Sequence, residues 1–419
     1  MTQKIGPRWL ESRSLAAGES FHGGRTADST RRRPARDSSA RLWKTAVIGK
    51  RYPQSRLWGI PSRPIICWGG VMDFGAALIL TDRLSSWQQE KLRRRDTHGE
   101  SKLIKLAKGA YVLSKDWRRL TPKQRLFLRV AALQHAVPGG VLTGQAAALA
   151  MGLSTWSGPG QMRIDLYLPE GRRPRRLPGV RLHRPKTGGT FPTSVTTVAG
   201  MPVRVVSPVR AALDAARFDG AAAGLVPLEN AWHEGRLTGH DLDVQLDLLA
   251  GTPGMPYARK AREIATPYGE SPAESISALH IAAVGLPAPL RQVSIFDGDG
   301  VFIGRVDFFF PDVGMILEYE GAAKTTGAEG RNTALRELHR SRGFHNLGMV
   351  LRHLDAETLR DPSALLGVKD LHRALQVRGR PVDRRFWAPP PSPEQWDRGV
   401  RYPTGSGSRH LPPDLRDCA

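Results

Sequence analysis

Two apolar stretches in the last third of the chain carry carboxylates where strands would bury them. Val301–Phe310 contains Asp307, and Met315–Gly321 contains Glu318 and Glu320. Side chains alternate between the two faces of a strand, so Glu318 and Glu320 should share one face. A hairpin joining the stretches would bring Asp307 near Glu318. This part of the chain is therefore predicted to form a sheet that holds several acids.

Carboxylates in an apolar strand pair repel one another and resist burial. A hard divalent cation removes that conflict, because Mg²⁺ takes oxygen ligands, activates a water and stabilises the leaving oxygen in phosphodiester cleavage. We therefore predict Asp307, Glu318 and Glu320 as ligands of Mg²⁺. Glu274, near the start of a helix, and Lys324, just past the second strand, complete the predicted catalytic set. Helix capping is the alternative role for Glu274.

The charge of the chain favours a polyanionic partner. Its 62 Lys and Arg outnumber its 39 Asp and Glu, which gives a net charge of +23. Nucleic acid is the first partner that such a surplus suggests, and an acidic membrane surface is the second. A genome rich in arginine codons is the bland explanation. The basic residues are clustered, however, with 11 basic against 5 acidic side chains in residues 78–120.

Two cysteines, Cys67 and Cys418, are too few for a disulfide framework or a structural zinc site. This usage fits a reducing cytoplasm. The apolar stretch at residues 65–80 contains Asp73 and is shorter than the roughly 20 residues that a bilayer span needs. We therefore expect a cytoplasmic protein that does not cross a membrane.

A basic helix and a hairpin are predicted between residues 78 and 120. Residues 85–95 fit a helix, which Ser85 or Thr81 can cap and which turns Trp87 and Leu92 inward. Residues 103–113 fit a hairpin with its turn at Lys108 and Gly109. A helix fits the DNA major groove, and a basic hairpin can follow the phosphates. The predicted DNA-contacting side chains are Gln88, Gln89, Lys91, Arg93, Arg94, Arg95, Lys105 and Lys108.

This arrangement resembles the winged helix-turn-helix at the start of AbiEi-type antitoxins, in which a helix precedes a strand, a glycine turn and an aromatic strand, as in residues 106–112. Residues 141–149 and 207–213 resemble the middle region of such proteins. The resemblance implies a DNA-binding regulator that recognises a promoter in double-stranded DNA and pairs with a toxin protein.

The C-terminal pieces resemble the Vsr-like group of the restriction-endonuclease-like fold. The matching positions are Glu274 on the leading helix, Asp307 in Arg-Val-Asp-Phe and Glu318 in Leu-Glu-Tyr-Glu-Gly. A helix at residues 333–342 and a strand at residues 349–352 would complete the core. The usual motif places Lys where this chain has Glu320. The resemblance implies a Mg²⁺-dependent DNA endonuclease, and an inactive fold retained for dimerisation or DNA docking is the alternative.

The whole chain is predicted to be a multidomain α+β protein with disordered ends. The predicted parts are a basic tail (1–71), a winged helix-turn-helix (72–120), a mixed α/β connector (121–265), a restriction-endonuclease-like α/β domain (266–378) and a disordered tail (379–419).

The basic tail has two further interpretations, a transit peptide or a reading frame that truly starts at Met72. Three functions follow for the protein: a DNA-binding regulator, a metal-dependent endonuclease, or a binder of RNA or membrane surfaces through charge alone.

Overall fold

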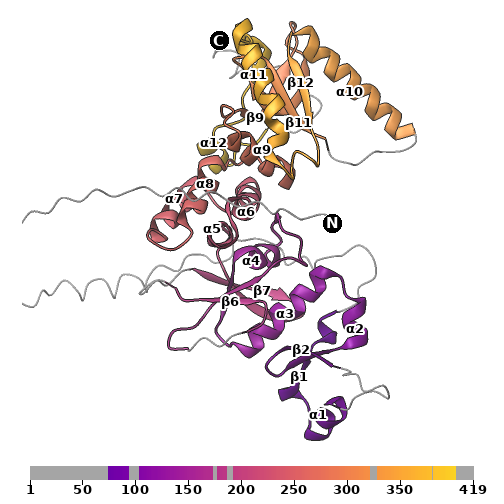
Figure 1. The fold of residues 1–419 in the computed structure, drawn as a ribbon, viewed down its shortest axis with the longest axis vertical. Helices are drawn as coiled ribbons and strands as arrows, with labels where there is room; N and C mark the ends of the chain where they lie inside the picture. Colours follow the sequence, from indigo (N-terminus) through magenta and orange to yellow (C-terminus); the bar gives the residue numbers. More distant parts are fainter. Residues whose placement is uncertain are drawn as a thin grey trace, which may run out of the picture. The chain divides into compact units, whose positions relative to one another are not determined.

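The structure, a computed structural model, describes residues 74–93, 103–172, 177–185, 192–320, 328–379 and 381–402. These ranges form three sheets with helices between and around their strands (Figure 1). The predicted mixture of helices and strands is confirmed. Within the same ranges, no helix combines the length and the apolar composition that a membrane span requires. The predictions made for residues 1–71 lie outside the described residues.

The first sheet combines one short strand with a two-stranded hairpin. Its elements and the adjoining helices are β1 (Ile79–Leu80), α1 (Ser86–Arg93), β2 (Leu103–Ala107), β3 (Ala110–Leu113) and α2 (Ser114–Arg119). The strand order is β1-β3-β2, and both pairings are antiparallel. The predicted turn is confirmed, and Gly109 has a φ of 74°, a conformation that favours glycine. We call residues 79–123 the hairpin unit.

The second sheet mixes parallel and antiparallel pairs. Its strands are β4 (Val141–Thr143), β5 (Ile164–Tyr167), β6 (Val180–His183), β7 (Thr193–Val198) and β8 (Met201–Val206). Their order is β6-β5-β4-β8-β7, with β5–β6 and β4–β8 parallel. The helices of this region are α3 (Pro122–Ala136), α4 (Gly144–Ala150), α5 (Pro208–Asp219), α6 (Ala221–His233), α7 (Gly239–Leu248) and α8 (Met255–Ile264). α5 begins at a serine cap, since Ser207 Oγ accepts from Arg210 N at 3.4 Å.

The third sheet belongs to the C-terminal region, residues 266–402, which we call the C-terminal domain. Its elements are α9 (Pro272–Ala283), β9 (Leu290–Phe296), β10 (Phe302–Phe310), β11 (Met315–Tyr319), α10 (Ala328–Asn346), β12 (Val350–Leu354), α11 (Leu366–Arg378), β13 (Trp387–Ala388) and α12 (Pro393–Asp397). The order is β12-β11-β10-β9-β13, and only the β11–β12 pair is parallel within this sheet. Short 3-10 turns in the described ranges lie at Phe74–Ala77, Thr81–Arg83, Pro362–Leu365 and Arg384–Phe386.

Two apolar cores lie against the third sheet. One joins Phe308, Phe310 and Leu317 to residues of α9 and α11, and the other joins Phe309 and Ile316 to α10. The sheet therefore lies between helices, with its strands buried on both faces. Such burial explains why β10 and β11 are nearly continuous apolar runs.

The hairpin unit and the middle region share one core. Leu80, Ala107 and Ala110 belong to the same buried cluster as Leu133 of α3 and Leu142 of β4. The predicted boundary at residue 120 therefore does not separate two hydrophobic cores. Because α3 packs against the hairpin and against β8, it connects the first sheet to the second.

Residues 381–402 fold, although the sequence predicted disorder from residue 379 onward. β13 pairs with β9, with Trp387 opposite Ile295. Trp396 is 2% exposed and has ring contacts with Tyr268 and Tyr402. The physical reason is that a few large aromatic side chains anchor this Pro-rich segment without any regular apolar period.

We expect Trp396→Ala to lower the free energy of unfolding by about 3–5 kcal/mol, the range for truncating a buried aromatic side chain. Urea unfolding followed by circular dichroism measures the loss. Trp156→Ala, at a side chain that is 40% exposed, is the matched control. Equal stability of the two variants would show that the C-terminal segment does not pack as described.

Candidate functional site

The predicted acids Asp307 and Glu318 lie opposite each other on neighbouring strands. β10 and β11 pair with Phe308 opposite Leu317, so Asp307 is level with Glu318, as the sequence predicted. The backbone N–H of Tyr319 donates to Asp307 Oδ2 at 2.9 Å, which fixes that carboxylate against β11. Two of the three predicted metal ligands are therefore neighbours.

Glu274 is linked to Asp307 through an amide. Gln292 on β9 donates its Nε2 to Glu274 Oε2 at 2.9 Å and to Asp307 Oδ1 at 3.2 Å. Gln292 has a φ of 53°, and a non-glycine residue in this left-handed region persists only where its surroundings hold it. Glu274 Oε2 also accepts from Glu270 N at 3.1 Å, a local contact at the start of α9. We call Glu274, Gln292, Asp307 and Glu318 the acid cluster.

The sequence did not predict Arg340, which holds both oxygens of Glu318. Its two terminal nitrogens donate to Oε1 at 2.9 Å and to Oε2 at 2.5 Å. The guanidinium also donates to Glu337 on the preceding turn of α10 and to the carbonyl of Arg305 on β10. A two-pronged arginine–carboxylate pair is among the strongest polar contacts in proteins.

Burial dominates the acidity of the cluster. Burial raises the pKa of Glu274 to about 7, and the nearby charge of Asp307 acts in the same direction. Burial also raises the pKa of Glu318 to about 7, although Arg340 works against it. Both glutamates are less than a tenth exposed. Two carboxyl groups that titrate near neutral pH mark this cluster as the electrostatically unusual part of the domain.

The remaining predicted catalytic residues do not join the cluster. Glu320 directly follows the end of β11. Its side chain is 70% exposed, and its Oε2 lies 3.9 Å from His353 Nδ1. Lys324 lies outside the described residues.

The acid cluster as arranged does not fit a resident Mg²⁺. Within the described residues, no three Asp, Glu, His or Cys side chains are grouped so that they could hold a metal ion. Arg340 uses both oxygens of Glu318, and the amide of Gln292 lies between Glu274 and Asp307. A groove of about 670 Å³ beside α10 is lined by Arg340 and Phe302 but by none of the three acids.

The predicted base-reading glutamines have local partners. Gln88 is exposed and closes a capping arrangement, since its Oε1 accepts from Ser85 N at 2.9 Å. Gln89 donates Nε2 to the carbonyls of Thr81 and Leu84 at 2.9 and 3.1 Å, so it stabilises the turn before α1. Gln88 therefore remains the more accessible of the two side chains.

The predicted inward orientation of Trp87 is wrong. Its side chain is 69% exposed, because the buried clusters around the first sheet are built by strands and by α3. Lys91 and Arg93 lie in α1, but their side chains, like that of Leu92, are outside the described positions, as are Arg94 and Arg95 altogether.

Basic side chains cover the outside of the hairpin unit. Lys105 on β2 and Lys108 in the turn are exposed, as the sequence predicted for phosphate contacts. Four further basic side chains on α2 and at the start of α3 are exposed but were not among the predicted DNA contacts: Lys115, Arg118, Arg119 and Lys123. Their clustering within nine positions of the sequence could have identified them.

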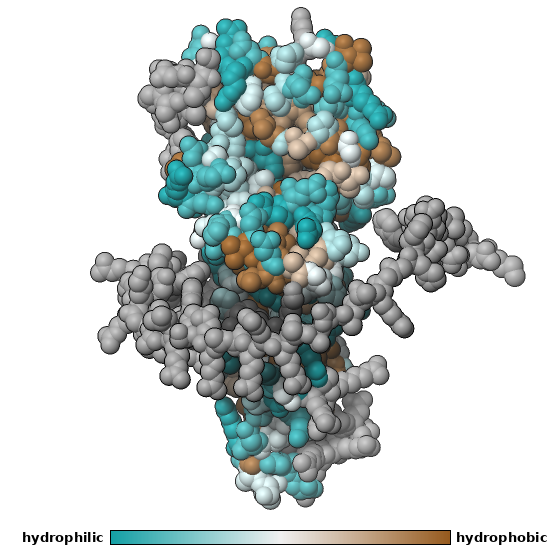
Figure 2. All heavy atoms as spheres, turned by 90° about the vertical axis from the view of Figure 1, so that its left-hand side faces the viewer, coloured by the Kyte–Doolittle hydropathy of each residue, from teal (hydrophilic) through white to brown (hydrophobic). Residues whose placement is uncertain are grey.

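Arg125 holds the end of α2 in place under these basic side chains. Its guanidinium donates to the carbonyls of Trp117 and Arg118 at 3.0 and 3.2 Å. Thr121 and Gln124 form a capping box at the start of α3. The basic side chains therefore project from a fixed backbone. On the face drawn in Figure 2, the surface of this part of the chain is mostly hydrophilic.

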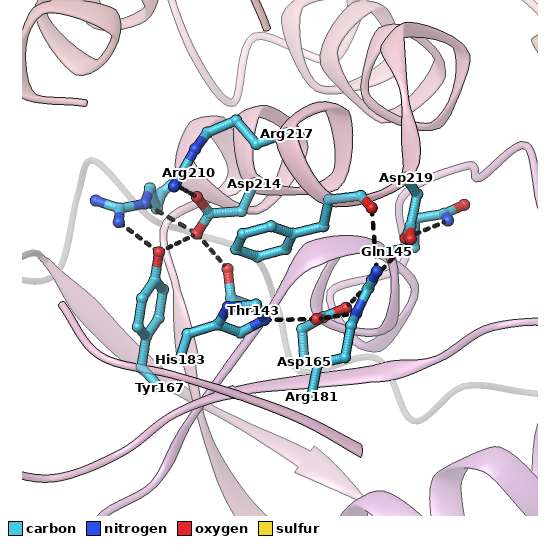
Figure 3. A network of polar contacts seen from close by, with 11 residues as sticks. Thr143, Gln145, Asp165, Tyr167, Arg181, His183, Arg210, Asp214, Arg217 and Asp219 are labelled. Carbon is cyan, nitrogen blue, oxygen red and sulfur yellow. Dashed lines mark hydrogen bonds and ion pairs between the residues drawn. The ribbon is translucent and has the colours of Figure 1, made fainter. Parts of the chain in front are cut away.

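A second polar network lies in the middle region (Figure 3). Asp214 on α5 is fully buried and accepts hydrogen bonds from Thr143 at 2.7 Å and from Tyr167 at 2.9 Å. Arg210 and Arg217, on the turns before and after it, also donate to Asp214. Burial, together with the charge of Asp214, raises the pKa of Tyr167 to about 12, so this phenol stays protonated.

The other half of the network centres on Asp165. Arg181 donates to its two oxygens at 2.7 Å each, and His183 Nε2 lies 2.7 Å from Oδ1 (Figure 3). Arg181 also pairs with Asp219 at the end of α5. The His183 ring stacks on Phe218 at 3.9 Å. The network therefore fastens α5 to β4, β5 and β6, and its carboxylates are satisfied internally.

Comparisons with known proteins give little further information. No family model and no curated protein matches the chain. Among solved structures, the chain is similar to one titled "Crystal structure of RV2827C protein from Mycobacterium tuberculosis", with 17% identity and a TM-score of 0.26. That match covers 50% of this chain and 82% of the other.

The raised pKa of Glu274 predicts a pH dependence of stability. The stabilisation from the protonated carboxyl is fully present below pH 4.5, the pKa of this group in the unfolded chain, and it is lost as pH rises through the folded pKa of about 7. Glu274→Gln keeps an uncharged side chain, so at about pH 8 it should be more stable than the natural protein, by an amount on the order of 1–3 kcal/mol. Thermal unfolding across pH measures this, with exposed Glu263→Gln as control. A variant with the natural pH profile contradicts it.

We expect Asp214→Ala to cost about 3–5 kcal/mol, because it leaves Arg210 buried without its carboxylate. Chemical denaturation gives the value. Asp243→Ala removes an exposed acid paired with Arg262 and should cost less than about 1 kcal/mol. Similar losses in the two variants would argue against a structural role for the buried network.

Proposed function

We propose that this protein binds double-stranded DNA through the hairpin unit. The observation that carries the proposal is the set of exposed basic side chains on three consecutive pieces of this unit. Lys105 and Lys108 lie on the hairpin, Lys115 and Arg119 on α2, and Lys123 at the start of α3. When cationic side chains neutralise phosphates, the DNA releases its condensed counterions, and this release drives non-specific binding.

The connectivity of the first sheet supports this proposal. β1 is followed by α1 and then by a hairpin whose second strand pairs with β1. This order of strand, helix and hairpin is the arrangement expected of a winged helix. In such a domain the helix approaches base edges while the hairpin follows the backbone. The side-chain amide of the exposed Gln88 on α1 can donate to a base edge, while its Oε1 accepts from Ser85 N.

Regulation of a promoter together with a toxin partner is the form of this function that the resemblance to AbiEi-type antitoxins implies. A DNA endonuclease is the alternative that the resemblance to Vsr-like proteins implies. The contacts of Glu318 with Arg340 weigh against that alternative, because they occupy the carboxylate that a metal would need. DNA binding is therefore the function that the geometry favours.

Salt dependence of duplex binding tests the proposal. Each phosphate contact contributes roughly −0.9 to the slope of log affinity against log salt. Lys105→Ala/Lys108→Ala and Lys115→Ala/Arg119→Ala should each weaken binding and reduce the slope by up to about 2. Fluorescence anisotropy with a labelled duplex measures both quantities.

The matched control is Arg373→Ala/Arg378→Ala, which removes two exposed basic side chains from α11 in the C-terminal domain. Its slope should equal that of the natural protein. If all three variants lose affinity equally, the charge of the whole chain, and not the hairpin unit, makes the contact. Equal affinity for duplex DNA, RNA and anionic vesicles would overturn the proposal in favour of charge-only binding.

A further inference from the structure

The acid cluster has a positive partner within the fold. Asp307 and Glu318 face each other across β10 and β11, and Glu274 approaches Asp307 through Gln292. Carboxylates that face each other repel, and a divalent cation with oxygen ligands is one way to neutralise them. Arg340 reaches Glu318 from α10 and donates to both oxygens of its carboxylate.

The surroundings of Arg340 fit a guanidinium in detail. All three of its nitrogens donate: Nε to Glu337, and the terminal nitrogens to Glu318, Glu337 and the carbonyl of Arg305. The guanidinium also lies over the ring of Phe344 on the same helix, with Cζ 5.6 Å from the ring centre. A guanidinium presents five N–H donors in one plane, whereas an ammonium group is a compact point charge with three donors.

The backbone of β10 also leaves room for Arg340. A Cβ atom on Gly304 would lie 2.7 Å from Arg340 Cδ, closer than such atoms approach in folded proteins. Gly304 lies at the register shift between β9 and β10. The absence of a side chain at this point lets the arginine cross the strand and reach Glu318.

We infer that Arg340 is the resident counter-ion of the acid cluster, in the place that a divalent cation would take, and that the C-terminal domain folds and acts without a metal and without cleaving DNA. This inference is independent of DNA binding by the hairpin unit. It assigns Arg340 a positioning role: it holds Glu318 in the sheet and closes the carboxylate to other cations.

Thermal unfolding of the full chain tests the inference through substitutions of the pair. Arg340→Met should lower the melting temperature, because it leaves Glu318 buried beside Asp307 without compensation. The melting temperature of Arg340→Lys should lie between those of the natural protein and Arg340→Met, because an ammonium group does not match both carboxylate oxygens as a planar guanidinium does. Arg340→Met/Glu318→Gln should recover stability relative to Arg340→Met alone, because the uncompensated charge is gone.

Exposed Arg336→Met, one turn earlier on α10, is the matched control and should leave the melting temperature unchanged. If Arg340→Met proves too unstable to purify, the lysine variant and the double variant still decide the question. A double variant no more stable than Arg340→Met, or an Arg340→Met protein as stable as the natural one, would overturn the inference.

Divalent cations provide the second readout. Mg²⁺, Mn²⁺ and EDTA should each leave the melting temperature of the natural protein unchanged, and plasmid DNA should remain intact with either metal. A rise in melting temperature with Mn²⁺ that disappears in Glu318→Gln would show that a metal neutralises the cluster. Metal-dependent nicking that disappears in Asp307→Asn would overturn the inference outright.

Discussion

Arginines that neutralise buried carboxylates hold this structure together. Asp165, Asp214, Glu229 and Glu318 are each 7% exposed or less, and each accepts hydrogen bonds from an arginine. A buried ion pair contributes little net stability compared with apolar packing, yet the loss of one partner is costly. The pairs therefore act as constraints: Glu229 with Arg291 and Glu318 with Arg340 each join a helix to a strand, and Asp165 with Arg181 joins two neighbouring strands.

These pairs change what the net charge of the chain means. A surplus of basic residues suggests a polyanionic partner, but Arg181, Arg210, Arg291 and Arg340 serve carboxylates inside the protein. Their planar, always charged guanidinium suits that task better than an ammonium does. Exposed basic side chains are the ones that can meet a partner, and Lys105 and Lys108 of the hairpin unit are among them. For the proposed contact with DNA, the location of a basic side chain therefore matters more than the total number.

Local pattern was enough to predict the strands β10 and β11 and the hairpin contact between them. The apolar runs around Asp307 and Glu318 predicted two strands, and a tight hairpin leaves few alternatives for their register. Arg340 was not predictable in this way, because its contact with Glu318 depends on how α10 packs across the sheet. Trp87 and Trp396 show the same limit. One was predicted buried and is exposed, while the other lies in a segment predicted disordered and is buried.

Within the described ranges, Glu274 is the buried carboxylate that an amide holds instead of an arginine. Arg340 donates to Glu318 at one side of the cluster, while burial and then the negative charge of Asp307 raise the pKa of Glu274 at the other side. A proton on Glu274 reduces the repulsion that remains on that side. Below about pH 7, a guanidinium at one side and a proton at the other together supply the charge that a single divalent cation would bring. The cluster can therefore stay buried without a metal.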